Sequence, residues 1–209
     1  MSRDPHPSEL TMDRWLHWIG LAAATVAVAA LLWDARRSRL DMFAAVIAYC
    51  VGLLAVIGCS ALYHLAGASR YRPLFRRLDH AAIFLLIAGT YTPFALNGTL
   101  GSEGPALLAF VWALGLIGIG LKLFIPAALE RTSIAIYLLL GWCGLAAINA
   151  IWSAASPGVL ALLATGGVFY TIGVVFHVSA GLRFQNAIWH AFVLLGAACH
   201  YAAVFHEIG

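Results

Sequence analysis

Charged residues are scarce in this 209-residue sequence. Only 10% of its residues carry a charge, while 63% are hydrophobic; soluble proteins average roughly 25% charged and about half apolar. The mean hydropathy is correspondingly high, at +0.91. A water-soluble core of this length would leave most of its surface to apolar side chains. The composition therefore excludes a water-soluble domain and predicts that the bilayer is the solvent.

Cysteine is also scarce, and its pattern excludes two kinds of site. The four cysteines all lie in apolar runs, and no two of them form a C-x-x-C pair. This is typical of packed thiols and not of a disulfide framework or a thiolate zinc site. The formal net charge is only +3, and the basic residues form short clusters between apolar runs, so no nucleic-acid partner is expected.

Seven apolar runs are present, and each is long enough to cross a bilayer, which takes about 20 residues. The first run is longer than a signal-peptide core and has tryptophans at both edges, so we expect it to be retained. The predicted spans are residues 15–33, 42–65, 78–96, 106–125, 134–152, 159–180 and 187–205. With no linker, repeat or low-complexity tract, the sequence predicts one all-α membrane domain over residues 1–209, a seven-transmembrane helix bundle.

Basic residues between the spans predict how the bundle is oriented, because cytoplasmic loops are enriched in Lys and Arg. One side of a seven-span chain would hold nine of them: Arg3, Arg14, Arg70, Arg72, Arg76, Arg77, Lys122, Arg131 and Arg183. The other side would hold three: Arg36, Arg37 and Arg39. We therefore expect a cytoplasmic N-terminus and an outer C-terminus, in a bacterial cytoplasmic (inner) membrane.

Several polar residues of the spans share one depth. Polar side chains inside a membrane are costly and indicate function. The topology places a set of them at the cytoplasmic ends of the second, third, sixth and seventh spans: Ser60, His64, Asp79, His177 and His190. Ser60 and His64 are four residues apart, so they share one helix face.

Imidazoles, a carboxylate and a hydroxyl at one depth suit a zinc ion, since His and Asp are normal zinc ligands. Zinc would also lower the pKa of a bound water towards about 7. His17 enters the first span at the same depth and is a candidate accessory residue. The alternative is that each histidine bonds a neighbouring helix or reaches the headgroups, while Asp79 pairs with Arg76 or Arg77.

These motifs resemble the hemolysin III branch of the progestin and adipoQ receptor family. The resemblance covers all seven spans. It rests on Ser60-Ala-Leu-Tyr-His64, on Leu78-Asp79-His80 leading into Ala88-Gly-Thr-Tyr-Thr-Pro93-Phe, on Ala187-Ile-Trp-His190, and on Cys199-His200-Tyr. In this family, which is similar to the alkaline ceramidases, such residues surround a zinc ion near the cytoplasmic face. The resemblance implies His64, His190 and Asp79 at the metal, with Asp79 as the water-positioning base and Ser60 orienting the water or an oxyanion.

The sequence departs from that pattern at one position. The receptor branch has H-x-x-x-H at the start of the seventh span, and here Asn186 occupies the first histidine position. An amide oxygen is a poorer zinc ligand than imidazole. Three alternatives stay open: Asp79 enters the coordination shell, His177 supplies a third nitrogen, or the site is weak or empty.

Three functions are compatible with this residue set. The first is a zinc-dependent intramembrane hydrolase of lipid amides or esters, with membrane lipids as partners and a lipid as substrate. The second is a non-enzymatic sensor or regulator of membrane state. The least favoured is a pore-forming cytolysin, because the polar residues gather at one end and do not line a path across the membrane. No protein partner is predicted.

Overall fold

The computed structural model describes residues 6–67, 69–125, 132–179 and 181–208, and within these ranges the chain forms helices and no strand. Seven helical segments are long and apolar enough to span a membrane, which confirms the predicted seven-span helical class. Arg3, Arg131 and the end of the sixth predicted span at residue 180 lie outside the described residues. The elements are α1 (Pro7–Ala35), α2 (Leu40–Leu65), α3 (Arg72–Leu96), η1 (Gly101–Glu103), α4 (Gly104–Phe124), α5 (Ser133–Trp142), η3 (Cys143–Ala147), α6 (Ile148–Ala154), α7 (Pro157–Val178) and α8 (Gln185–Ile208).

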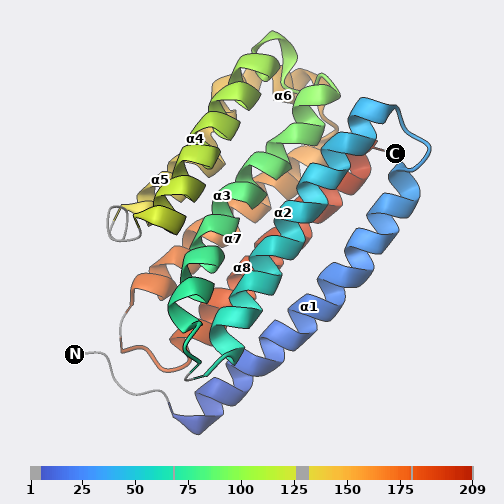
Figure 1. Ribbon diagram of the computed structural model, residues 1–209. Coiled ribbons are helices and arrows are strands. Elements are labelled where there is room, and N and C mark those ends of the chain that lie inside the picture. The colour runs from blue at the N-terminus through green and yellow to red at the C-terminus, as the bar shows by residue number, and fades with distance from the viewer. Residues whose placement is uncertain (1–5, 68, 126–131, 180, 209) are drawn as a thin grey trace.

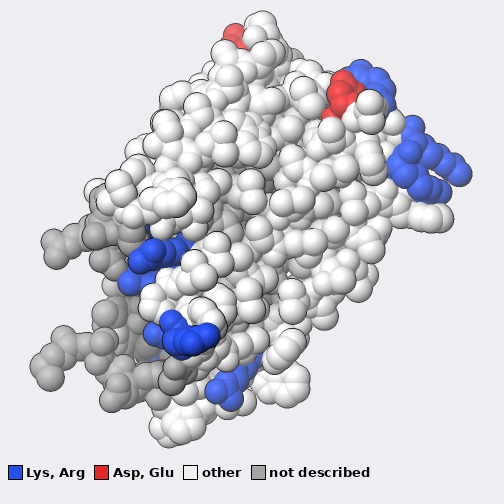
Figure 2. All heavy atoms as spheres, in the orientation of Figure 1, with Lys and Arg blue, Asp and Glu red and all other residues white. Residues whose placement is uncertain are grey.

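The long helices run alternately up and down in one bundle (Figure 1). α1 packs against α2 and α8, α3 packs between α2 and α4, and α7 pairs with α8. Basic side chains gather at the two ends of the bundle on the face shown in Figure 2, and the band between them is nearly free of charge. This uncharged band is what a hydrocarbon environment requires of helices that cross it.

The first helix begins earlier than the apolar run suggests, at Pro7 and not near Trp15. Proline is favoured in the first helical turn, and the His6 side chain caps the helix by accepting a hydrogen bond from the Ser8 amide at 3.3 Å. One face of α1 is buried along its whole length, at every third or fourth residue: Glu9, Asp13, His17, Gly20, Ala24, Val28, Leu31 and Ala35. The two added turns carry acidic residues onto this buried face.

Two glycines set the spacing between α2 and α3. A Cβ atom at Gly52 would lie 2.8 Å from the Leu86 backbone, and one at Gly89 would lie 2.8 Å from the Ala48 carbonyl oxygen. Small residues at such positions let helix backbones approach closely in lipid. The close packing therefore fixes the middle turns of α2 against those of α3.

The fifth span is interrupted, because α5 gives way to the 3-10 segment η3 before α6 continues. The Tyr91 hydroxyl from α3 lies at this interruption. It is 3.1 Å from the Leu140 carbonyl oxygen and 2.9 Å from that of Gly141, and it accepts a hydrogen bond from the Gly144 amide at 2.8 Å. A backbone group left unsatisfied in hydrocarbon is costly, so one side chain supports the break.

We expect Tyr91→Phe to lower the free energy of unfolding by about 1–3 kcal/mol, because backbone groups at the interruption lose their partner. Equilibrium unfolding in detergent micelles would measure this loss. Tyr49→Phe is the matched control, since the fully buried Tyr49 hydroxyl has no hydrogen-bond partner among the described residues. Equal effects of the two substitutions would contradict the supporting role of Tyr91.

Candidate metal centre

Four titratable side chains meet at the end of the bundle where α1 begins. They are Asp13 and His17 from α1, His64 from α2 and His190 from α8. One ligand atom from each lies within 4.8 Å of the others; His64 is half-buried and the other three residues are buried. Helices far apart in the sequence thus bring one carboxylate and three imidazoles into a single group, which we call the histidine–aspartate cluster.

The Asp13 carboxylate joins two of the histidines. Its Oδ1 lies 2.6 Å from Nδ1 of His190, and its Oδ2 lies 3.1 Å from Nδ1 of His64. The main-chain carbonyl oxygen of Asp13 lies 2.7 Å from Nδ1 of His17, one turn further along α1. Ionised carboxylate and carbonyl oxygens can only accept hydrogen bonds, so Nδ1 of His17 and Nδ1 of His190 donate, while Nδ1 of His64 lies in ion-pair contact with the carboxylate.

The three imidazole rings pack directly against one another. The ring centroids of His17 and His64 are 4.8 Å apart, those of His17 and His190 are 4.3 Å apart, and those of His64 and His190 are 4.5 Å apart. In a neutral imidazole whose Nδ1 donates, Nε2 carries the lone pair. Nε2 of His17 and Nε2 of His190 are therefore the nitrogens that these two residues offer to a metal, and His64 adds a third imidazole.

Ser60 and Asp79 lie beside the cluster. The Ser60 hydroxyl is 3.4 Å from Nε2 of His17, and the Asp79 carboxylate lies close to Ser60. Asp79 is not one of the four residues of the histidine–aspartate cluster. The structure thus brings Ser60 to Nε2 of His17 and brings Asp79 close to Ser60.

Two other candidate residues lie apart from the cluster. His177, near the end of α7, is exposed, and its ring packs against Trp189 with 4.9 Å between centroids. Asn186 is exposed in the first turn of α8, one turn before His190. Neither residue belongs to the described group that could hold a metal.

Asp13 is the residue that the sequence reasoning missed, because hydropathy placed the start of the first span after it. A signal was present in the spacing. Glu9, Asp13 and His17 are each four residues apart, and the same face continues through Gly20 and Ala24. Such a polar extension of a small-residue stripe indicates that the helix begins earlier and turns its acidic residues inward.

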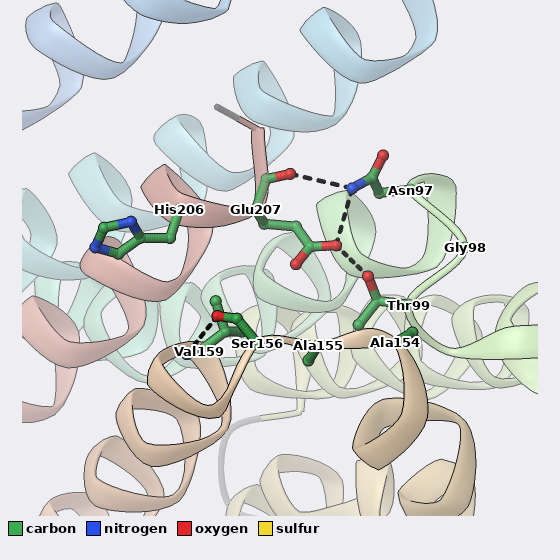
Figure 3. A pocket seen from close by; sticks show the side chains of 9 residues that line it. All are labelled: Asn97, Gly98, Thr99, Ala154, Ala155, Ser156, Val159, His206 and Glu207. Atoms are coloured by element: carbon green, nitrogen blue, oxygen red, sulfur yellow. Dashed lines mark hydrogen bonds between the residues drawn. The ribbon is translucent and has the colours of Figure 1, made fainter.

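A polar cavity with a volume of about 340 Å³ lies at the opposite end of the bundle (Figure 3). There the Glu207 carboxylate accepts hydrogen bonds from the Asn97 amide at 3.1 Å and from the Thr99 hydroxyl. His206 lies apart from these three residues in the same view. This carboxylate joins the end of α8 to the segment after α3, and it is not part of a group of metal ligands among the described residues.

The donor set of the histidine–aspartate cluster fits zinc better than a hard cation. Imidazole nitrogens suit zinc and other late transition metals, whereas calcium and magnesium take mainly oxygen ligands. Metal-binding histidines also commonly donate their second ring nitrogen to a carboxylate or a backbone carbonyl. The contacts of Asp13 with the three Nδ1 atoms have this form.

Comparison with known proteins places the chain in a family. The family described as "Haemolysin-III related" matches residues 7–201. The chain belongs to this family. The match includes α1 with Asp13 and His17, and it ends just beyond His200 in α8.

The relatives of this haemolysin III family protein extend from bacteria to animals. This chain is 36% identical over 195 residues to "Hemolysin-3" of Bacillus cereus, and the alignment covers 92% of this chain and 88% of the relative. It is 36% identical over 154 residues to "Hemolysin-3 homolog" of Bacillus subtilis (strain 168), covering 74% and 72%. It is 29% identical over 163 residues to the human "Monocyte to macrophage differentiation factor", covering 75% and 67%. No solved structure matches the chain significantly. The predicted placement in the hemolysin III branch of the progestin and adipoQ receptor family is confirmed.

If the histidine–aspartate cluster of this haemolysin III family protein holds a metal, we expect Asp13→Asn to weaken metal binding about 10–100-fold, the usual cost of losing a carboxylate that orients metal-binding histidines. The amide keeps the size of the side chain but offers only one acceptor oxygen to two Nδ1 donors. Titration against a competing chelator measures the change. Asp34→Asn is the control, because Asp34 lies exposed near the other end of α1. Equal affinities of the two variants would contradict the role of Asp13.

Proposed function

We propose that this membrane protein is a zinc-dependent hydrolase of lipid amides or esters. The observation that carries the proposal is the position of the histidine–aspartate cluster directly beside the pair formed by Ser60 and Asp79. A nitrogen-rich metal site next to a second carboxylate has the parts that hydrolysis of an acyl group requires. Its place at one end of the bundle would let a lipid reach it from the bilayer.

His17, His64 and His190 would hold the metal through Nε2, and Asp13 would keep their Nδ1 atoms protonated. This arrangement supplies the third imidazole that Asn186 cannot provide, and the nitrogen comes from α1. Three protein ligands leave one position of a tetrahedral site open, as catalytic zinc requires. Neither Asp79 nor His177 is then needed as a ligand.

When bound, zinc lowers the pKa of a coordinated water to near neutrality and polarises an acyl carbonyl. The side chains of this chain would do the rest. Asp79 would accept the proton of the attacking water and later return it to the leaving group. Ser60, which lies close to both Asp79 and His17, would orient that water. The bundle around them would exclude other water molecules.

A second candidate, a non-enzymatic regulator of membrane state, is favoured by the number of ligands. If the Asp13 carboxylate also binds the metal, the histidine–aspartate cluster supplies four ligands, and closed four-ligand zinc sites are typically structural. Metal or lipid occupancy would then change helix packing without turnover. The two candidates differ in the role of Asp79, which matters only for the hydrolase.

We expect purified protein to hold about one zinc ion per chain. His64→Ala and His190→Ala should each lose most of it, since each removes one of three nitrogens. His200→Ala should keep it, because His200 lies roughly 15 Å further along α8 and contacts the Leu163 carbonyl. Elemental analysis of protein never exposed to chelator makes the measurement. Zinc well below one per chain, or equal loss from all three variants, would refute the site.

Asp79→Asn should retain zinc and lower the rate of fatty-acid release about 10²–10⁴-fold, the usual contribution of a general base. Reconstituted vesicles holding candidate amide and ester lipids provide the assay. Absence of release from any of them, with zinc bound, would favour the regulator. A wild-type rate in Asp79→Asn would remove this residue from the mechanism.

The end that holds the histidine–aspartate cluster is also proposed to face the cytoplasm of a bacterial cell, because most basic residues gather there. Alkaline phosphatase fused after the C-terminus should therefore be active, since it needs the oxidising periplasm to form its disulfides. The same enzyme fused in the loop between α2 and α3 is the control and should be inactive. The reverse pattern would overturn the orientation.

A further inference from the structure

A cavity of about 410 Å³ opens beside the histidine–aspartate cluster. Asp13 and His64 form its inner wall, and Leu10, Arg14, Gly67 and Arg72 line the rest. The cavity therefore connects the cluster with the basic end of the bundle. A molecule bound in it would touch metal-binding side chains and arginines at the same time.

Two arginines give this cavity its charge. Arg14 follows Asp13 on α1, and Arg72 begins α3, where its guanidinium lies 4.7 Å from the ring centroid of Tyr63. The ring contact holds the guanidinium plane but leaves its N–H groups free to donate. Within the ranges that the structure describes, neither arginine forms an ion pair. The one carboxylate that lines the cavity, Asp13, is engaged by histidines.

Apolar side chains surround the opening and set its depth in the membrane. Leu10, on the cavity wall, is 44% exposed, and Trp15 and Trp18 on the same part of α1 are 63% and 56% exposed. Tryptophan is enriched at the level of lipid headgroups. The two arginines thus lie where phosphate groups of the bilayer are found, with apolar surface beside them for acyl chains.

We propose that this cavity binds the phosphate of an anionic phospholipid between Arg14 and Arg72 and presents an acyl ester of the same lipid to the histidine–aspartate cluster. Arginine matches phosphate geometry through paired N–H groups. In a glycerophospholipid only a few bonds separate the phosphate from the nearer ester carbonyl, so one molecule can reach both. The proposal rests on the hydrolase function above and names its substrate class.

The step balances without a further reactant. The oxygen of water bonds to the acyl carbon, the ester C–O bond breaks, and the glycerol oxygen leaves with one proton as an alcohol. The fatty acid departs as its carboxylate, and the remaining proton passes to solvent.

The experiment measures lipid retention and lipid hydrolysis separately. Protein is reconstituted in vesicles of equal parts phosphatidylglycerol and phosphatidylcholine, and the lipids retained after extraction into detergent are counted by native mass spectrometry. We expect wild type to retain phosphatidylglycerol in preference to phosphatidylcholine. In the double variant Arg14→Gln/Arg72→Gln, the ratio of the two retained lipids should fall at least about tenfold. Arg70→Gln/Arg183→Gln removes two charges from the same end outside the cavity and should keep the preference. Wild-type retention in the cavity variant, or equal loss in both variants, would overturn the site.

Two further arms separate the possible ligands and the two proposals. Inorganic phosphate should not displace the retained lipid; displacement would show a small-anion site and overturn the lipid assignment. Fatty-acid release should be faster from phosphatidylglycerol than from phosphatidylcholine or ceramide. Release from all three at equal rates would overturn the substrate class while the hydrolase stands. Selective retention without any release would keep the binding site and reject the hydrolase.

Discussion

One buried carboxylate holds the functional end of this bundle together. Asp13 is only 7% exposed, and its oxygens contact nitrogens of His64 on α2 and His190 on α8. An isolated charge at such a position would cost several kcal/mol, and removing its partners commonly costs about 3–5 kcal/mol. Because the carboxylate and its partners come from three helices, the carboxylate is satisfied only when α1, α2 and α8 are in register. The polar cluster and the packing therefore depend on each other.

The same constraint explains how the surrounding side chains are ordered. His17 is tied to the Asp13 carbonyl, so its free nitrogen points towards Ser60. Ser60 in turn lies close to Asp79 on α3, which the close crossing near Gly52 and Gly89 holds against α2. A chain of contacts thus leads from α1 to α3 through small, short side chains with few rotamers. In the proposed hydrolase, such preorganisation would keep a water or an acyl group in a defined place.

Much of the fold could be predicted because a bilayer allows few solutions. A span of about 20 apolar residues must be a helix, so composition and breakers were enough to find seven of them. The interruption in the fifth span could not be predicted. It depends on Tyr91, which lies some 50 residues earlier and supports the break through tertiary contacts that hydropathy does not contain.

The candidate site was predicted in part for the same reason. Topology alone brings His64 and His190 to one end, since each lies at a span terminus. Asp13 was missed because a hydropathy window ends where charged residues begin. The buried face of α1 nevertheless continues through those charged residues. His17 was noted only by its depth. The contacts among the histidines depend on how each helix is rotated about its own axis. For α1, the stripe of small residues is the sequence feature that indicates this rotation.

The departure at Asn186 changes which helices a metal would join. In the family pattern, two ligands lie one turn apart on α8, and with His64 a metal would join only α8 and α2. With His17 as the third ligand, it would join α1 to α2 and α8. α1 is otherwise held by one narrow buried face, which packs against α2 and α8. A ligand that binds only the assembled form stabilises that form in proportion to the logarithm of its free concentration over Kd. Metal occupancy would therefore strengthen the docking of α1, and the same helix supplies Leu10, Asp13 and Arg14 to the neighbouring cavity. In the proposed hydrolase, the metal would thus hold in place the helix that lines the lipid cavity, in addition to its role in hydrolysing the lipid.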